Sequence, residues 1–150
     1  MRTLVPSVAI VAMLTACGSS QPQPVAIDTA NDTCAHCRMI VSDRRLAAEI
    51  VAAGEEPKVF DDIGCLRDYV AGHTLVPGAR IFVADHRTGA WVLAAEAVYT
   101  RSAVLATPMA SGILAHVDDA SRDADAEARG ERLDVAAILG SAAAAQRARQ

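Results

Sequence analysis

The sequence predicts a small single domain of the α+β class. Short apolar stretches alternate with turn residues along most of the chain, as is typical of short strands, and only a few segments have the apolar spacing of a helix. The chain has 150 residues, about the size of one domain. Aromatic residues make up only 3% of it, so we expect a core built from Val, Ile, Leu and Ala.

The first residues resemble a bacterial lipoprotein signal. Arg2 precedes an apolar run that is too short to span a bilayer, and small residues then lead directly to Cys17. We expect a signal peptide over 1–16, with Cys17 lipidated as the first residue of the mature protein and a flexible tether over 17–31. The alternative is an ordinary signal peptide with an incidental cysteine.

The net charge of the chain indicates which partners to expect, and the residue after Cys17 indicates in which membrane a lipid anchor would lie. The chain carries 18 acidic and 14 basic residues, a net charge of −4, with no basic cluster to neutralise phosphates, so we expect no nucleic-acid partner. A lipid anchor predicts the periplasmic side of a membrane. Gly18, where no aspartate stands, favours the outer membrane over the inner one.

The domain itself is expected over 32–140, with a fraying tail over 141–150. Runs rich in apolar and β-branched residues predict strands over 38–42, 46–52, 58–60, 80–84, 91–93, 97–99 and 113–117. A tight turn that ends in Gly89 joins two of these strands into a hairpin.

Helices are expected where carboxylate caps precede apolar periodicity. Asp61 or Asp62 caps a helix that begins at Ile63 and ends at Gly72. Alanines spaced four apart predict a second helix over 118–129, stopped by Gly130, and Asp134 caps a short third helix over 135–139. The order strand–strand–helix–strand then occurs twice.

Soft donor atoms are concentrated in residues 34–39. Cys34, His36, Cys37 and Met39 fall within this short stretch. Thiolate and thioether sulfurs select soft ions, above all Cu(I). Cys37 and Met39 are two positions apart, so in an extended segment both sulfurs lie on one face. Cys-X-X-Cys alone fits a disulfide, a redox pair or half a zinc site, and Met39 favours copper among these.

Other candidate ligands lie further along the chain. Without Cys17, three cysteines remain, so at least one thiol of the exported chain is unpaired. Met109 follows Pro108 in a loop, and is either a ligand or a gap-filling residue. Cys65 is either a ligand, with its thiol pKa lowered by the helix dipole, or a small buried hydrophobe. In an extended segment His36 points away from the cysteines. The remaining histidines are isolated in the sequence and are expected to be surface or hydrogen-bonded residues: His73, His86 and His116.

Several blocks, in this order, resemble the NosL family. They are Cys34-x-x-Cys37-x-Met39, Asp43, Ala48-Glu49, Phe60-Asp61-Asp62-Ile63-Gly64-Cys65, Asp85-x-x-Thr88-Gly89-x-Trp91, Ala95, Ala97-x-Tyr99 and Thr107-Pro108-Met109-x-x-Gly112. The resemblance covers roughly residues 32–117. It implies paired ββαβ units, similar to the core of organomercurial lyase.

The same resemblance implies a function. NosL-like proteins are periplasm-facing lipoproteins that bind Cu(I) and deliver it for the maturation of nitrous oxide reductase, through an ABC-type complex with a periplasmic subunit. The ligands implied here are Cys37, Met39 and Met109, with Cys34, Cys65 and His36 of second rank. The family usually has glycine where this chain has Arg38, a cation that would lower the pKa of the Cys37 thiol or gate docking.

We therefore expect a copper carrier rather than an enzyme. One alternative is an enzyme like organomercurial lyase, with Cys37, Cys65 and Asp61 or Asp62 in catalytic roles. Another is a thiol redox protein that uses Cys34 and Cys37.

Overall fold

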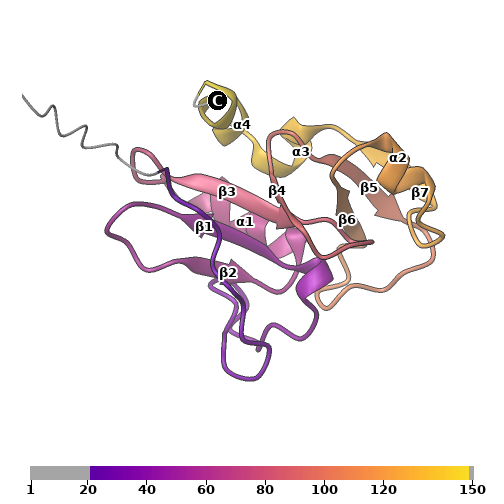
Figure 1. Ribbon diagram of the computed structural model, residues 1–150, viewed down its shortest axis with the longest axis horizontal. Coiled ribbons are helices and arrows are strands. Elements are labelled where there is room, and N and C mark those ends of the chain that lie inside the picture. Colours follow the sequence, from indigo (N-terminus) through magenta and orange to yellow (C-terminus); the bar gives the residue numbers. More distant parts are fainter. Residues whose placement is uncertain (1–20, 149–150) are drawn as a thin grey trace, which may run out of the picture.

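The computed structural model describes residues 21–148 and confirms the α+β class (Figure 1). The predicted signal peptide and Cys17 lie outside these residues. One sheet has four strands in the order β2-β1-β3-β4, and the other has three in the order β6-β5-β7. Among the described residues, no helix has the length and apolar character needed to cross a membrane.

The four-stranded sheet is antiparallel throughout. It contains β1 (Ala48–Val51), β2 (Lys58–Phe60), β3 (Arg80–Ala84) and β4 (Trp91–Leu93). The last three have the predicted bounds, and β3 and β4 form the predicted hairpin. The predicted strand over 46–52 is shorter because its start forms a 3₁₀ turn, η1 (Arg44–Leu46), capped by Asp43.

The three-stranded sheet consists of β5 (Val98–Ser102), β6 (Ile113–His116) and β7 (Gly130–Leu133). The order β1-β2-α1-β3 and the order β5-β6-α2-β7 make two ββαβ units, and in each unit the first strand lies between the other two. The predicted duplication is thus confirmed, with β4 added to the edge of the first sheet.

Strand β7 was not predicted. The stretch predicted as one helix over 118–129 contains only α2 (Asp119–Asp123), which Asp118 caps. The chain then turns, and Gly130 does not stop a helix but begins β7 with a φ of 156°. A Cβ at Gly130 would lie 1.9 Å from the carbonyl oxygen of Arg101, so only glycine permits this close pairing. The strand is mostly exposed and therefore lacks apolar alternation.

Three further helices complete the domain. Helix α1 (Ile63–Gly72) is capped by Asp62, and α3 (Val135–Leu139) is capped by Asp134, as predicted. Gly72 is the last helical residue rather than the residue beyond the helix, and His73 is the C-cap.

The segment predicted to fray forms α4 (Ala142–Arg147). The Gln146 side chain is buried there. It donates to the carbonyl oxygen of Ala79 at 2.9 Å and accepts from the N–H of Ile81 at 3.1 Å. These two hydrogen bonds attach the helix to the start of β3.

The strand predicted over 38–42 does not form. Only an isolated bridge joins Thr33 to Ile40. Between them the chain folds back on itself, because the N–H of Cys34 donates to the carbonyl oxygen of Met39 at 2.7 Å and the N–H of Arg38 donates to that of Cys34 at 3.1 Å. The segment that carries the predicted ligands is therefore a tight turn.

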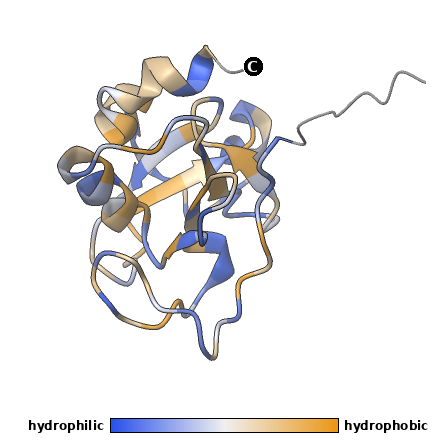
Figure 2. Cartoon of the chain, turned by 90° about the vertical axis from the view of Figure 1, so that its left-hand side faces the viewer, coloured by the Kyte–Doolittle hydropathy of each residue, from blue (hydrophilic) through white to orange (hydrophobic). Residues whose placement is uncertain are grey.

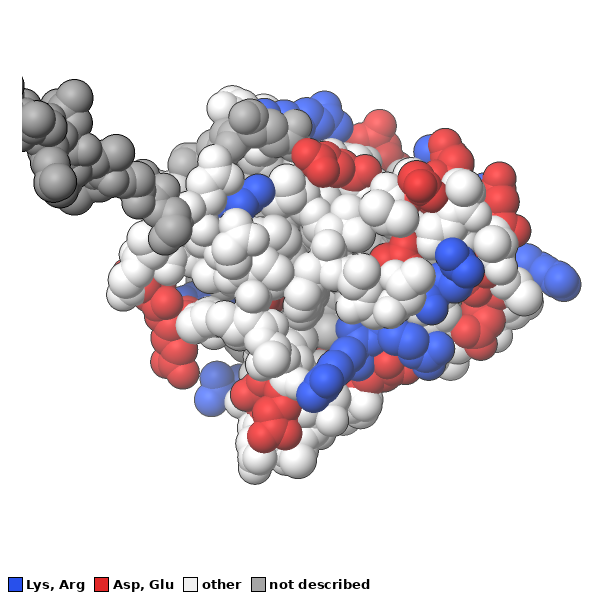
Figure 3. All heavy atoms as spheres, in the orientation of Figure 1, with Lys and Arg blue, Asp and Glu red and all other residues white. Residues whose placement is uncertain are grey.

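The main core lies between the two sheets and the helices. Its largest fully buried side chains include Phe60, Ile63, Leu66, Ile81, Tyr99 and Ile113. Figure 2 shows apolar residues in the strands at the centre of the molecule. A smaller cluster joins Ile27 to Val41 and Ala47, so the packed chain begins within the predicted tether. On the face drawn in Figure 3, acidic and basic side chains are interspersed.

Glu49 in β1 is fully buried and gives the fold a pH dependence. Its Oε2 accepts from the N–H of Val25 at 3.0 Å, whereas Oε1 has no partner in the described part of the chain. Burial raises the pKa of Glu49 from 4.5 to about 7. Between these pH values the unfolded chain loses its proton while the folded chain keeps it, so the free energy of unfolding falls as pH rises.

We predict that the free energy of unfolding of the wild type falls by on the order of 3 kcal/mol between about pH 4.5 and pH 8. The Glu49→Gln variant, which has no carboxyl group at this position, is expected not to show this fall. Denaturant unfolding at several pH values measures this loss in the wild type and in the variant. Replacement of the exposed Glu55 by glutamine is the matched control and is expected to keep the wild-type slope. A Glu49→Gln variant with the same slope would contradict the prediction.

Candidate metal centre

Three thiols and one carboxylate meet at the start of α1. The ligand atoms of Cys34, Cys37, Asp61 and Cys65 all lie within 4.8 Å of one another, and the three cysteines are free. Cys34 and Cys65 are buried, and Cys37 is half-buried. This cluster can hold a metal ion, since thiolate and carboxylate groups at such distances can converge on one centre.

The turn of residues 34–39 positions two of these thiols. The N–H of Ala35 donates to the carbonyl oxygen of Val59 in β2 at 2.8 Å, which holds the turn against the sheet. Strand β2 ends at Phe60, so Asp61 and the first turn of α1 follow directly beside it. Cys65 lies in that first turn and faces the core.

Asp61 is the carboxyl member of the cluster. The Cys37 thiol donates to its Oδ1 at 3.3 Å. Its Oδ2 is buried and has no hydrogen-bond partner in the part of the chain that the structure describes. A buried carboxylate oxygen without a donor is costly, and a cation bound beside it would remove that cost.

Burial determines the protonation of the thiols. It raises the pKa of Cys65, with smaller contributions from Cys34 and Asp61. The predicted lowering of the Cys65 pKa by the helix dipole is therefore wrong, because desolvation of the thiolate outweighs the dipole. Burial also raises the pKa of Cys37, and Arg38 does not offset it. A metal ion must therefore displace protons from these thiols, which couples its binding to pH.

The two predicted methionine ligands lie at the surface. Met39 is 55% exposed and Met109 is 44% exposed. An exposed methionine is not a gap-filling core residue, which leaves the sulfur of Met109 accessible to an ion or a partner.

Asp62 fixes the loop that carries Met109. Besides capping α1 through the N–H of Gly64 at 2.6 Å, its carboxylate accepts from the Thr107 hydroxyl at 2.6 Å, the Met109 N–H at 2.9 Å and the Ser111 hydroxyl at 2.5 Å. Asp61 contacts Cys37 and Asp62 contacts Met109, so two adjacent residues bring together segments that are far apart in the sequence.

Gly64 permits this close approach of the loop. A Cβ at that position would lie 2.6 Å from the Cβ of Ser111 and 2.9 Å from Oδ1 of Asp62. We predict that Gly64→Ala lowers the free energy of unfolding by about 1–3 kcal/mol and displaces the loop. Denaturant unfolding measures the first effect.

Gly72 offers the matched control in the same helix. A Cβ there meets nothing within 4 Å, so Gly72→Ala is expected to leave stability unchanged or to raise it by up to about 1 kcal/mol. Equal effects of the two substitutions would show that contact with the loop does not constrain position 64.

The four histidines lie in different surroundings. His36 is exposed and outside the thiol cluster. His73 lies at the surface, stacked on Tyr69, as predicted. His86 and His116 are buried and both contact Asp125, so they are not isolated. Sequence reasoning missed this group because β3 and β6 belong to different sheets, and only the packing of these sheets brings their ends together.

The fold and the site define a small α+β protein with a thiol cluster that can hold a metal ion. Comparison of the chain with protein-family models, with well-described proteins and with solved structures finds no match.

Proposed function

We propose that this protein is a Cu(I) carrier of the NosL kind, anchored by lipid on the periplasmic side of the outer membrane. It would deliver copper for the maturation of nitrous oxide reductase, either to an ABC-type maturation complex or to the enzyme itself. The observation that carries this proposal is the group of three free thiols, in which the half-buried Cys37 meets two buried cysteines, together with the exposure of Met39 and Met109.

A second observation supports the resemblance. Arg38 adopts a φ of 69°, a left-handed conformation that glycine takes without strain and other residues adopt rarely. Glycine is the residue usual at this position in NosL-like proteins. The backbone at Arg38 therefore has a conformation that glycine would adopt without strain, which supports the resemblance although the residue differs.

Cys37, Met39 and Met109 are the proposed primary ligands. Binding replaces the Cys37 thiol proton with Cu(I) and releases the proton to solvent, so the net charge of the site does not change. The two exposed thioethers are weak ligands that a partner can replace one at a time. Cys34 and Cys65 lie beneath Cys37 and supply further sulfur when the outer ligands leave.

Anaerobic titration of the reduced protein with Cu(I), in competition with a coloured chelator, tests the proposal. We expect one ion per chain, held more tightly than by the chelator, and released to apo nitrous oxide reductase or its maturation complex. Met109→Leu is expected to weaken binding and to keep the fold, since the Asp62 bond is to the backbone. Failure of the wild-type protein to retain Cu(I) would overturn the proposal.

The geometry also favours a second candidate, an enzyme like organomercurial lyase. Cys37, Cys65 and Asp61 lie together, as that chemistry needs. Two thiols would bind the mercury of an organomercurial and give up their protons, one to Asp61 and one to solvent. The carbon–mercury bond would then break as the carbon takes the proton from Asp61, and mercury would remain on two thiolates. Release of hydrocarbon that is lost in Asp61→Asn would establish this activity. The exposed methionines have no role in it.

A further inference from the structure

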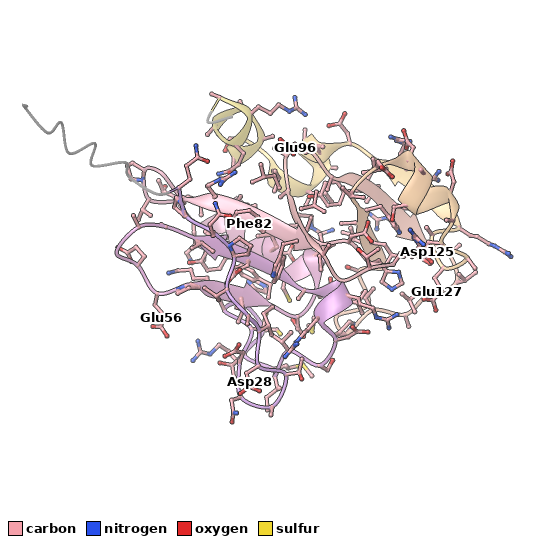
Figure 4. All side chains as sticks on the ribbon, in the orientation of Figure 1. Asp28, Glu56, Phe82, Glu96, Asp125 and Glu127 are labelled. Atoms are coloured by element: carbon pink, nitrogen blue, oxygen red, sulfur yellow. The ribbon has the colours of Figure 1, made fainter. Side chains whose placement is uncertain are left out.

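Outside the thiol cluster, two histidines and an aspartate meet where the two ββαβ units join. His86 follows β3, His116 is the last residue of β6, and Asp125 follows α2. The N–H of His86 donates to the carbonyl oxygen of Ala115, next to His116, at 2.8 Å. Figure 4 shows Asp125 at the end of the molecule that contains α2 and β7.

The ring nitrogens of the two histidines and the carboxylate of Asp125 lie as close together as the ligands of one metal ion. Nδ1 of His86 lies 2.6 Å from Oδ2 of Asp125, and Nε2 of His116 lies 2.9 Å from the same oxygen. The ligand atoms of all three residues lie within 4.8 Å of one another. Both imidazoles are almost completely buried, and the Asp125 side chain is 8% exposed.

Hydrogen bonding alone explains this arrangement poorly. Both histidines contact one oxygen of Asp125, whereas its Oδ1 accepts only from the N–H of Glu127 at 2.9 Å. Nδ1 of His116 is buried and has no partner within residues 21–148. A network built only for hydrogen bonding would leave no buried imidazole nitrogen unpaired.

The distances suit a metal ion after a small adjustment. Zinc binds histidine nitrogen and carboxylate oxygen at about 2.0–2.2 Å, so two ligand atoms at a tetrahedral centre lie roughly 3.3 Å apart. The nitrogen–oxygen pairs would therefore open by roughly 0.4–0.7 Å from their present separations of 2.6 and 2.9 Å.

Charge and the surrounding residues favour a cation. Asp125 brings a carboxylate to the two imidazoles, and its Oδ2 lies against a ring nitrogen of each. Oε2 of Glu127 lies 3.7 Å from Nε2 of His86, and Glu127 is half exposed. A carboxylate beside the second nitrogen of a histidine ligand orients the ring and strengthens the ligand.

We propose that His86, His116 and Asp125 form a second metal site, which takes a divalent ion of borderline character such as Zn²⁺ or Cu²⁺. Imidazole and carboxylate donors suit these ions, whereas the sulfur donors near α1 suit softer ones. Glu127 lies at the surface beside the site, and an ion would enter there. The site is independent of whichever ion the thiol cluster binds.

NMR of the full-length protein with Zn²⁺ alone tests the proposal directly. Long-range ¹H–¹⁵N spectra report each imidazole nitrogen. We expect Nδ1 of His86 and Nε2 of His116 to shift to values of metal-bound nitrogen as Zn²⁺ is added, while His36 and His73 keep their free positions. Spectra in which His86 and His116 do not move at saturating Zn²⁺ would overturn the proposal.

Binding stoichiometry provides the second measurement. We expect His86→Gln to bind one Zn²⁺ fewer than the wild type, or to bind it at least about tenfold more weakly, and to keep the ion of the thiol cluster. His73→Gln, on the surface, is the matched control and is expected to bind as the wild type does. Loss of the same ion from both variants, or from neither, would contradict the assignment.

Discussion

Replacement of Asp62 by alanine is expected to lower the free energy of unfolding by about 3–5 kcal/mol. The carboxylate is fully buried and accepts four hydrogen bonds, one that caps α1 and three that hold the loop of Met109. Its removal leaves buried donors unpaired and detaches the loop from the helix. Denaturant unfolding measures the loss, and hydrogen exchange of the Met109 and Gly112 amides reports the detachment.

Asp134 supplies the matched control, because it caps α3 through the N–H of Ala136 alone at 2.7 Å. Asp134→Ala is expected to cost about 1 kcal/mol, the usual value for a helix cap. Equal losses in the two variants would mean that Asp62 acts only as a cap and that the loop has other support.

Replacement of Cys37 by alanine is expected to weaken Cu(I) binding by about 100-fold or more, which corresponds to ~2.7 kcal/mol. Among the cysteines of residues 21–148, Cys37 alone is partly exposed, whereas Cys34 and Cys65 are buried. The variant is expected to fold, since the side chain makes a single hydrogen bond, to Asp61. Competition with a Cu(I) chelator measures the affinity.

Cys65→Ser is the informative companion. If Met39 and Met109 complete the site, the deeply buried Cys65 contributes little, and its replacement changes the affinity less than about tenfold. A loss as large as that of Cys37→Ala would place the ion among Cys34, Cys37 and Cys65 instead. An affinity that is unchanged in both variants would exclude a copper site in this cluster.

The predicted elements agree best with the structure where residues close in the sequence determine where an element begins and ends. Strands β2, β3 and β4 have the predicted bounds because turn residues border short apolar runs, and the capping aspartates of α1 and α3 mark their starts. The failures have a common cause, which is dependence on distant partners. Strand β7 is polar and forms only because β5 offers an open edge, and α4 is held by Gln146 against β3.

In the candidate site too, some features could be predicted from the sequence and others depend on distant parts of the chain. The identity of its donors is visible in the sequence, since soft sulfur atoms in one short stretch already indicate a metal. The turn of residues 34–39 was not visible, because its hydrogen bonds are between backbone groups and Arg38 does not signal a positive φ. The grouping of His86, His116 and Asp125 depends entirely on how the two units join, and no spacing along the chain encodes it.

The adjacency of Asp61 and Asp62 has an evolutionary consequence. A single peptide unit, about 3.8 Å between Cα atoms, separates the anchor of Cys37 from the anchor of Met109. Insertions are tolerable in the turns that join the strands between either sulfur and this pair, since a longer turn leaves the paired strands in place. One residue inserted between the two aspartates would instead rotate α1 by about 100° relative to β2 and separate the sulfurs. If the protein carries copper as proposed, selection should therefore act most strictly on this dipeptide, although neither residue is among the proposed primary ligands of the ion.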